Sequence, residues 1–134
     1  MEKIVLDTSV VVKWFHQETH SQEALGFLSQ FRKGKIQIIA PKIIILELAN
    51  ALFFGAGFDL ALVNESLSSF ANLSLELVDI DQDLLEKSVQ IMIEKQIAIY
   101  DCLFLALAKK ERCCLITADR KHHLRQVYSR VSYL

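Results

Sequence analysis

Apolar residues are distributed along the chain in two alternating patterns. Short apolar runs at residues 3–6, 36–40, 75–80, 113–116 and 131–134 predict strands. Between them, apolar residues recur with helical spacing, which predicts helices over 10–15, 19–34, 44–54, 60–73, 81–92, 100–112 and from 119 onward. Strands that alternate with helices form parallel sheets covered on both faces. The pattern therefore predicts an α/β fold with three α/β/α layers and a central parallel sheet.

Several residues mark where the predicted helices begin. Thr19 or Ser21 is expected to cap the helix that follows it, and Asp81 is expected to cap the helix over residues 81–92. Pro41 suits the first turn of the next helix, because a helix leaves its first N–H groups unpaired in any case. The chain shows no internal repeat and no linker, so residues 1–134 are expected to form a single domain.

Composition agrees with a globular protein. The chain has 134 residues, of which 52% are hydrophobic and 23% charged, so it can bury a core and is not disordered. It has no apolar run long enough for a membrane span and no basic leader before an apolar segment. Its cysteines, Cys102, Cys113 and Cys114, are odd in number and lack C-x-x-C spacing, which disfavours disulfides and zinc. We expect a soluble protein in the reducing cytoplasm.

Charge is unevenly distributed, although the net charge is only −1. Residues 59–86 contain seven acids and no Lys or Arg, whereas residues 109–134 contain seven bases, two acids, His122 and His123. Such polarity can steer a polyanion toward the C-terminal part of the chain. The alternative is that these charges are ordinary solvated helix faces.

Acidic residues stand at four positions where a charge needs an explanation. Asp7 and Asp119 each follow a predicted strand, and ligands of open α/β sheets bind at the carboxyl ends of the strands. Glu47 and Asp101 interrupt strongly apolar helices. A carboxylate in such surroundings is costly unless it is paired, protonated or bound to a cation. We expect the four to converge on one pocket.

A divalent cation is the ligand that best suits four convergent carboxylates. Few bases lie near Asp7 or Asp119 along the chain; Lys13, Arg120 and Lys121 are among them. Mg²⁺ and Mn²⁺ prefer oxygen ligands, and beside a polyanion they can activate water for phosphodiester cleavage. The alternative is that the acids are N-caps and solvent-facing residues.

The motifs around these acids resemble those of PIN-domain ribonucleases, especially VapC-type toxins. The matching segments, in order, are I-V-L-D-T-S, I-L-E-L-A-N-A-L, I-Y-D-C-L-F-L-A-L-A and L-I-T-A-D-R-K, and they span nearly the whole chain. The resemblance implies a PIN-like, Rossmann-like fold and an acidic quartet that holds Mg²⁺ or Mn²⁺ and cleaves single-stranded RNA segments. The matching site residues are the acids Asp7, Glu47, Asp101 and Asp119, the hydroxyls Ser9 (with Thr8 as an alternative) and Thr117, and Asn50, which can orient Glu47.

The chain departs from the family after its last acid. Where the family has a hydrophobic or aromatic residue, His122 and His123 precede Leu124, which leaves the contact of this loop with RNA open. Lys13, Arg120 and Lys121 can meet phosphates or serve as exposed bases.

Other side chains offer weaker signals. His16 and His20 are spaced to bind a metal on a helix, but no third ligand is evident. Trp14 and Phe15 can stack on a base, although core packing is the simpler reading. The chain has neither G-x-G-x-x-G nor a Walker A motif, so a nucleotide cofactor is not expected.

The resemblance implies a metal-dependent endoribonuclease that is the toxin of a toxin–antitoxin pair. Its partners would be RNA and a VapB-type antitoxin that places a basic or polar segment at the acidic pocket. Apolar residues between Ile43 and Leu73 exceed what one small domain buries, which predicts a homodimer. The alternatives are a PIN-fold RNA-binding or scaffold protein without turnover, and a phospho-acceptor receiver. The receiver is disfavoured because the chain lacks adjacent acids after the first strand.

Overall fold

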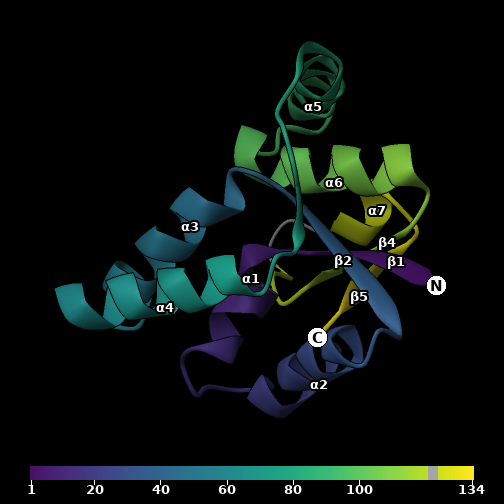
Figure 1. Cartoon of the computed structure of the whole chain (residues 1–134). Coiled ribbons are helices and arrows are strands. Elements are labelled where there is room, and N and C mark those ends of the chain that lie inside the picture. Colours follow the sequence, from purple (N-terminus) through teal and green to yellow (C-terminus); the bar gives the residue numbers. More distant parts are fainter. Residues whose placement is uncertain (121–123) are drawn as a thin grey trace.

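The computed structural model describes residues 1–120 and 124–134, and its strands form one sheet (Figure 1). The strands are β1 (Glu2–Leu6), β2 (Ile36–Pro41), β3 (Glu76–Val78), β4 (Cys114–Thr117) and β5 (Val131–Tyr133). They lie in the order β3-β2-β1-β4-β5, and every neighbouring pair is parallel. The predicted α/β fold with a central parallel sheet is confirmed.

Helices cover both faces of this sheet, as the alternating pattern predicts. They are α1 (Thr8–Val11), α2 (Ser21–Arg32), α3 (Ile44–Asn50), α4 (Leu60–Asn72), α5 (Gln82–Lys95), α6 (Ile99–Glu111) and α7 (Leu124–Val127). A 3-10 turn η1 (Val12–Trp14) extends α1, and a π-helical segment η2 (Ala51–Gly55) extends α3. Figure 1 shows α6 and α5 stacked above the sheet, α2 on the opposite face, and α3 and α4 beyond one end of the strands.

The order of the strands places a crevice at the carboxyl end of β1. From β1 the chain builds outward through β2 to β3, and it then returns to add β4 and β5 on the other side of β1. The loops that leave β1 and β4 therefore diverge toward opposite faces at this point. Open α/β sheets bind their ligands at such a switch point. Asp7 follows β1 and Asp119 follows β4, so both acids lie at this position.

The core is built around β1, β2 and α6. The side chains of Val5, Leu6, Ile38 and Ile39 are fully buried in the sheet. Every residue of α6 from 102 to 108 is buried, because this helix lies between the sheet and α5. A helix that is apolar all round is the pattern of a buried helix. The first turn of α6, which carries Asp101, is thereby fixed against the sheet.

Of the two capping predictions, the structure contradicts one and confirms the other. The residue that precedes α2 is His20, in a left-handed conformation with φ 66°, and not Thr19 or Ser21. The Ser21 hydroxyl instead accepts the Glu18 N–H at 2.9 Å, so it shapes the preceding turn. Asp81 does cap α5, because its carboxylate accepts the Leu84 N–H at 2.9 Å.

Pro41 lies at the end of β2 and not in the first turn of α3, which begins at Ile44. Its ring fits there because the sheet does not need an N–H at this position: the next residue, Lys42, donates its N–H to Val78 O at 2.9 Å. In the described residues, the last helix begins at Leu124 and not directly after Asp119.

All three cysteines are free thiols, as expected. Burial raises the pKa of the Cys102 thiol to about 11, so this side chain acts as a small core hydrophobe. In residues 1–120 and 124–134, no helix has both the length and the apolar character needed to span a membrane.

Candidate active site

The acids predicted from the sequence line one cavity at the carboxyl edge of the sheet. The cavity has a volume of about 480 Å³. The residues that line it are Asp7, Thr8, Ser9, Glu47, Asn50, Ala51, Asp101 and Asp119. They come from the ends of β1 and β4, from α3 with η2, and from the first turn of α6. Segments that are far apart in the sequence thus contribute to a single pocket.

Asp7 is held by two hydroxyl groups. Its Oδ2 accepts a hydrogen bond from Ser9 Oγ at 2.7 Å and another from Thr117 Oγ1 at 2.8 Å. Asp7 stands at the N-cap position of α1, yet its side chain makes no capping bond, so it is not the simple helix cap that was the alternative. Only 8% of Asp7 is exposed, and its carboxylate has a defined orientation.

The same hydroxyls tie the loop after β4 to the end of β1. Ser9 Oγ accepts the Ala118 N–H at 2.9 Å, and Thr117 Oγ1 accepts the Asp119 N–H at 3.0 Å. Thr117 is fully buried. Each hydroxyl therefore donates to Asp7 and accepts from the backbone that carries Asp119, which fixes these two acids relative to each other.

Glu47 is oriented by Thr8, and sequence reasoning missed this contact. Thr8 Oγ1 donates a hydrogen bond to Glu47 Oε1 at 2.7 Å. Asn50, expected to orient Glu47, is exposed one helical turn farther along and lines the same cavity. The signal in the sequence was the D-T-S motif, in which both hydroxyls next to Asp7 turn out to bind acids.

The electrostatics of the cavity favour a bound cation. Burial raises the pKa of the Asp7 carboxyl, the bonds from Ser9 and Thr117 oppose this rise, and the charge of Asp119 adds to it. Burial likewise raises the pKa of Glu47, and the charges of Asp7 and Asp101 add to the rise. The carboxylates thus repel one another, and a positive charge placed among them relieves the repulsion.

Comparison with known proteins decides the family. A family model described as "PIN domain" matches residues 4–128. The chain belongs to the PIN-domain family. This finding confirms the resemblance noted in the sequence and removes the phospho-acceptor receiver from consideration. No curated protein sequence is significantly similar to this PIN domain.

Solved structures of low sequence identity share the fold of this PIN domain. VapBC2 from Rickettsia felis, bound to a promoter DNA fragment, has a TM-score of 0.72 at 18% identity, with 98% of each chain covered. The Mycobacterium tuberculosis toxin VapC20, which cleaves the sarcin-ricin loop, has a TM-score of 0.70 at 13% identity, with 90% of this chain and 92% of that chain covered. VapBC from Salmonella typhimurium, bound to DNA, has a TM-score of 0.70 at 18% identity over 99% and 98% of the two chains.

The donor set of this PIN domain suits a hydrated Mg²⁺ or Mn²⁺ ion. Among the residues that the structure describes, no three His, Cys, Asp or Glu side chains are grouped closely enough to hold a metal ion unaided. Mg²⁺ does not require such a cage, because it keeps several waters and binds through one or two carboxylates. A roomy cavity with carboxylates on several walls matches that mode of binding.

Two further sequence expectations have structural outcomes, and those for the residues directly after Arg120 do not. Lys13 is not available to phosphates, because it is buried and its Nζ binds Glu18 Oε1 at 2.8 Å and Thr19 O at 2.7 Å. Trp14 packs against the core and donates its indole N–H to Ala24 O at 2.8 Å. Lys121, His122 and His123 lie outside the described residues.

The histidines considered as metal ligands face carboxylates instead. His16 Nε2 lies 3.9 Å from Glu18 Oε2, and His20 Nδ1 lies 3.5 Å from Glu23 Oε2. The ring of His16 also packs edge-on against Phe58.

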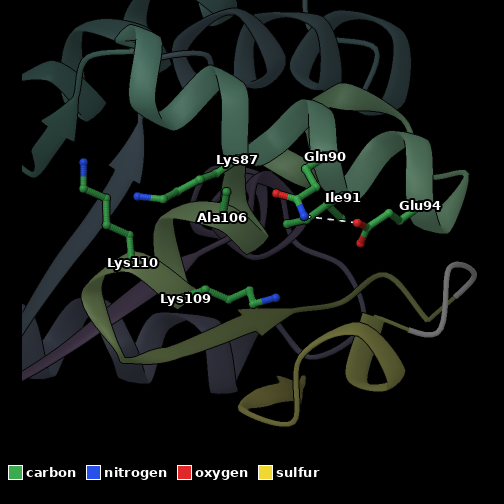
Figure 2. Close-up of a pocket in the computed structure, with 7 residues that line it drawn as sticks. All are labelled: Lys87, Gln90, Ile91, Glu94, Ala106, Lys109 and Lys110. Atoms are coloured by element: carbon green, nitrogen blue, oxygen red, sulfur yellow. Dashed lines mark hydrogen bonds between the residues drawn. The ribbon is translucent and has the colours of Figure 1, made fainter.

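A second cavity of this PIN domain shares no lining residue with the acidic cavity (Figure 2). It has a volume of about 300 Å³ between α5 and α6, with Ile91 and Ala106 among its lining residues. Lysines surround it, but two of them, Lys87 and Lys110, form ion pairs with the same acid, Asp83, at 2.8 and 3.1 Å. Because Asp83 compensates these two charges, the cavity attracts an anion only weakly.

Proposed function

We propose that this PIN domain is an endoribonuclease that requires Mg²⁺ or Mn²⁺, and that it is the toxin of a toxin–antitoxin pair. The observation that carries the proposal is the cavity lined by Asp7, Glu47, Asp101 and Asp119 at the switch point of the sheet. The likeness to VapC toxins, one of them described as cleaving the sarcin-ricin loop, supports RNA as the substrate.

The four acids share one task in this mechanism. Asp7, Asp101, Asp119 and Glu47 would hold the ion through their carboxylate oxygens, directly or through water. A divalent ion beside a phosphodiester lowers the pKa of water and stabilises the leaving oxygen.

The hydroxyl groups act on the carboxylates and not on the substrate. Ser9 and Thr117 hold Asp7 Oδ2 toward the loop that carries Asp119. Thr8 donates to Glu47 Oε1 and so orients the Glu47 carboxylate toward the cavity. Residues that orient metal ligands are positioning residues of the site.

The decisive experiment is cleavage of a labelled single-stranded RNA by the purified chain. We expect cleavage with Mg²⁺ or Mn²⁺ and none with EDTA. Asp101→Asn should lose at least about 100-fold, because loss of a residue that only orients a metal ligand already costs about 10–100-fold. Glu65→Gln is the matched control, because Glu65 is an exposed acid on α4, outside the cavity.

The outcome also separates the proposal from the alternative function. Cleavage that persists in EDTA would contradict the metal mechanism. Binding of RNA without cleavage under every metal condition would favour the second candidate, an RNA-binding or scaffold protein without turnover.

The toxin role predicts a VapB-type antitoxin as the partner. A basic segment of that protein would relieve the repulsion among the carboxylates, since a guanidinium engages two carboxylate oxygens at once. A cavity of about 430 Å³, lined by Ile43, Leu46, Glu47, Asn50 and Tyr100, adjoins the acidic pocket through Glu47 and Asn50. The antitoxin tail would continue into it and toward the groove between α3 and α4.

Growth of cells tests the toxin role separately from the chemistry. Expression of the wild type alone should arrest growth, Asp7→Ala should not, and co-expression of the antitoxin should restore growth. Growth that is normal with the active wild type would contradict the toxin role and leave the nuclease proposal intact. Cytoplasmic action fits the three free cysteines, which persist in a reducing compartment.

A further inference from the structure

Beside the acidic cavity, two arginines share one aromatic ring. The guanidinium carbon of Arg120 lies 4.9 Å from the ring centroid of Tyr133, and that of Arg125 lies 4.8 Å from the same centroid. Arg120 follows Asp119 directly, Arg125 is in α7, and Tyr133 is in β5. We call these three residues the Arg–Tyr–Arg cluster.

The cluster lies at the same edge of the sheet as the acids. Tyr133 of β5 is paired in parallel register with Thr117 of β4. Thr117 in turn donates its hydroxyl to Asp7. The cluster is therefore one strand away from the hydroxyl network that holds the acidic site.

Backbone carbonyls hold the two guanidinium groups. Arg120 donates to Leu134 O at 3.3 Å, and Arg125 Nε donates to Val131 O at 3.1 Å. A guanidinium has five N–H donors, so each arginine keeps most of its donors for a ligand. Stacking on a ring leaves these donors in the plane of the guanidinium, where they can reach the oxygens of a phosphate.

In the described part of the chain, no Asp or Glu side chain compensates the charge of the cluster. Among residues 1–120 and 124–134, neither Arg120 nor Arg125 forms a salt bridge, and both are exposed. Two like charges held on one ring repel each other, so the arrangement favours a bound anion. The lysines around the cavity in Figure 2 differ, because two of them are already paired with Asp83.

We propose that Arg120 and Arg125, held on Tyr133, bind backbone phosphates of the single-stranded RNA next to the bond that is cleaved. The inference rests on the proposed ribonuclease function. Carboxylates that bind a metal also repel the polyanionic strand, and fixed cations one strand away offset that repulsion. The ring adds an aromatic surface near the strand, and phosphate contacts of this kind position an RNA without reading its sequence.

The test measures binding of a fluorescent single-stranded RNA to the full chain as salt is varied. Ca²⁺ replaces Mg²⁺, and a gel verifies that the strand stays intact. Removal of two phosphate contacts with Arg120→Gln plus Arg125→Gln should weaken binding about tenfold and flatten the slope of log K against log salt by about 1.4. The matched control, Arg32→Gln plus Lys35→Gln, removes the same charge from exposed residues at the opposite edge of the sheet and should leave the slope unchanged.

The outcomes separate this inference from the proposed function. The inference would be overturned if both double variants weakened RNA binding equally, or if Arg120→Gln plus Arg125→Gln left the salt slope unchanged. RNA cleavage by the wild type would stand in either case. If Arg120→Gln plus Arg125→Gln keeps RNA binding but loses binding of an acidic partner peptide, the cluster binds a protein and the inference is wrong. A wild type that neither binds nor cleaves RNA would overturn both.

A second variant covers the case in which the first pair does not fold. Tyr133→Leu keeps both charges and removes the ring that holds them. We expect RNA binding to weaken severalfold with the melting temperature near that of the wild type, and unchanged binding would contradict the role of the ring.

Discussion

Asp7 and Thr117 are 110 residues apart in the sequence, and the hydroxyl of one binds the carboxylate of the other at 2.8 Å. Thr117 is fully buried. The Thr117 hydroxyl depends on Asp7 as its hydrogen-bond acceptor, because the side chain is inaccessible to solvent. At this scale the site is a set of paired groups and not a set of isolated acids.

Thr117→Val tests this pairing with almost no change in shape. The variant removes the hydroxyl that donates to Asp7 Oδ2 and accepts the Asp119 N–H, while Ser9 still donates to the same oxygen of Asp7. The loss of hydrogen bonds at a buried hydroxyl costs about 1–3 kcal/mol. We expect the free energy of unfolding to fall by about that amount, measured by urea denaturation. Thr117→Ser keeps the hydroxyl and is the control. Equal stability of the Val and Ser variants would show that the hydroxyl contributes nothing.

Helices α3 and α4, with η2 between them, present apolar side chains to solvent. The exposed residues of this apolar face are Ile45, Leu46, Phe53, Phe54, Leu60 and Leu62. Phe54 is 77% exposed and packs edge-on against Phe53. Apolar patches of this kind mark interfaces in soluble proteins.

The expected homodimer would use this face. We expect Phe54→Ser to shift sedimentation at micromolar concentration from dimer toward monomer, because it removes an exposed aromatic anchor. Ile93→Ser is the control, since Ile93 is 63% exposed on α5 and lies outside the face. A wild type that sediments as a monomer would contradict the dimer, and an equal shift in both variants would place the interface elsewhere.

The strands and the site acids were predictable because local signals coincide with the fold. β-branched runs predicted the sheet, and the alternation of strands with helices predicted that it is parallel. Asp101 stood out because it lies in the first turn of a helix whose next residues, 102–108, are apolar and, in the structure, buried. A charge in such a position is visible from the sequence alone.

The contacts between side chains were not predictable in the same way. That Thr8 binds Glu47 depends on how closely α3 approaches α1, and no local pattern encodes this distance. Lys13 looked exposed, but the turn that follows η1 folds Glu18 and Thr19 back onto it. These features arise from tertiary packing, which overrides local preference.

For the whole molecule, the acidic cavity links stability to pH and metal. The folded state raises the pKa of Asp7 and Glu47, so it binds their protons more tightly than the unfolded chain does. The stability that these groups contribute is complete below the unfolded pKa, about 4, and is lost as the pH rises through the folded pKa. The metal-free protein therefore carries a destabilising contribution from these groups at neutral pH.

Asp7→Asn should remove part of this contribution. In EDTA at neutral pH, we expect the variant to melt at a higher temperature than the wild type. The expected gain in the free energy of unfolding is roughly 1.4 kcal/mol for each unit by which folding raises the pKa of Asp7. The difference should shrink toward pH of about 4, where the wild-type carboxyl is protonated. Thermal melts across this range measure it, with Glu65→Gln as the control. A gain that does not vary with pH would contradict the electrostatic cause.

The link between Asp7 and Thr117 also sets when the active pocket can exist. A ribosome makes Asp7 among the first residues. The Thr117 hydroxyl, which links Asp7 to the Asp119 N–H, can form its two hydrogen bonds only after residue 117 has left the exit tunnel. Contacts between such distant residues form late in folding. For an enzyme proposed to cut RNA, this order means that the pocket is assembled only after most of the described chain has been synthesised.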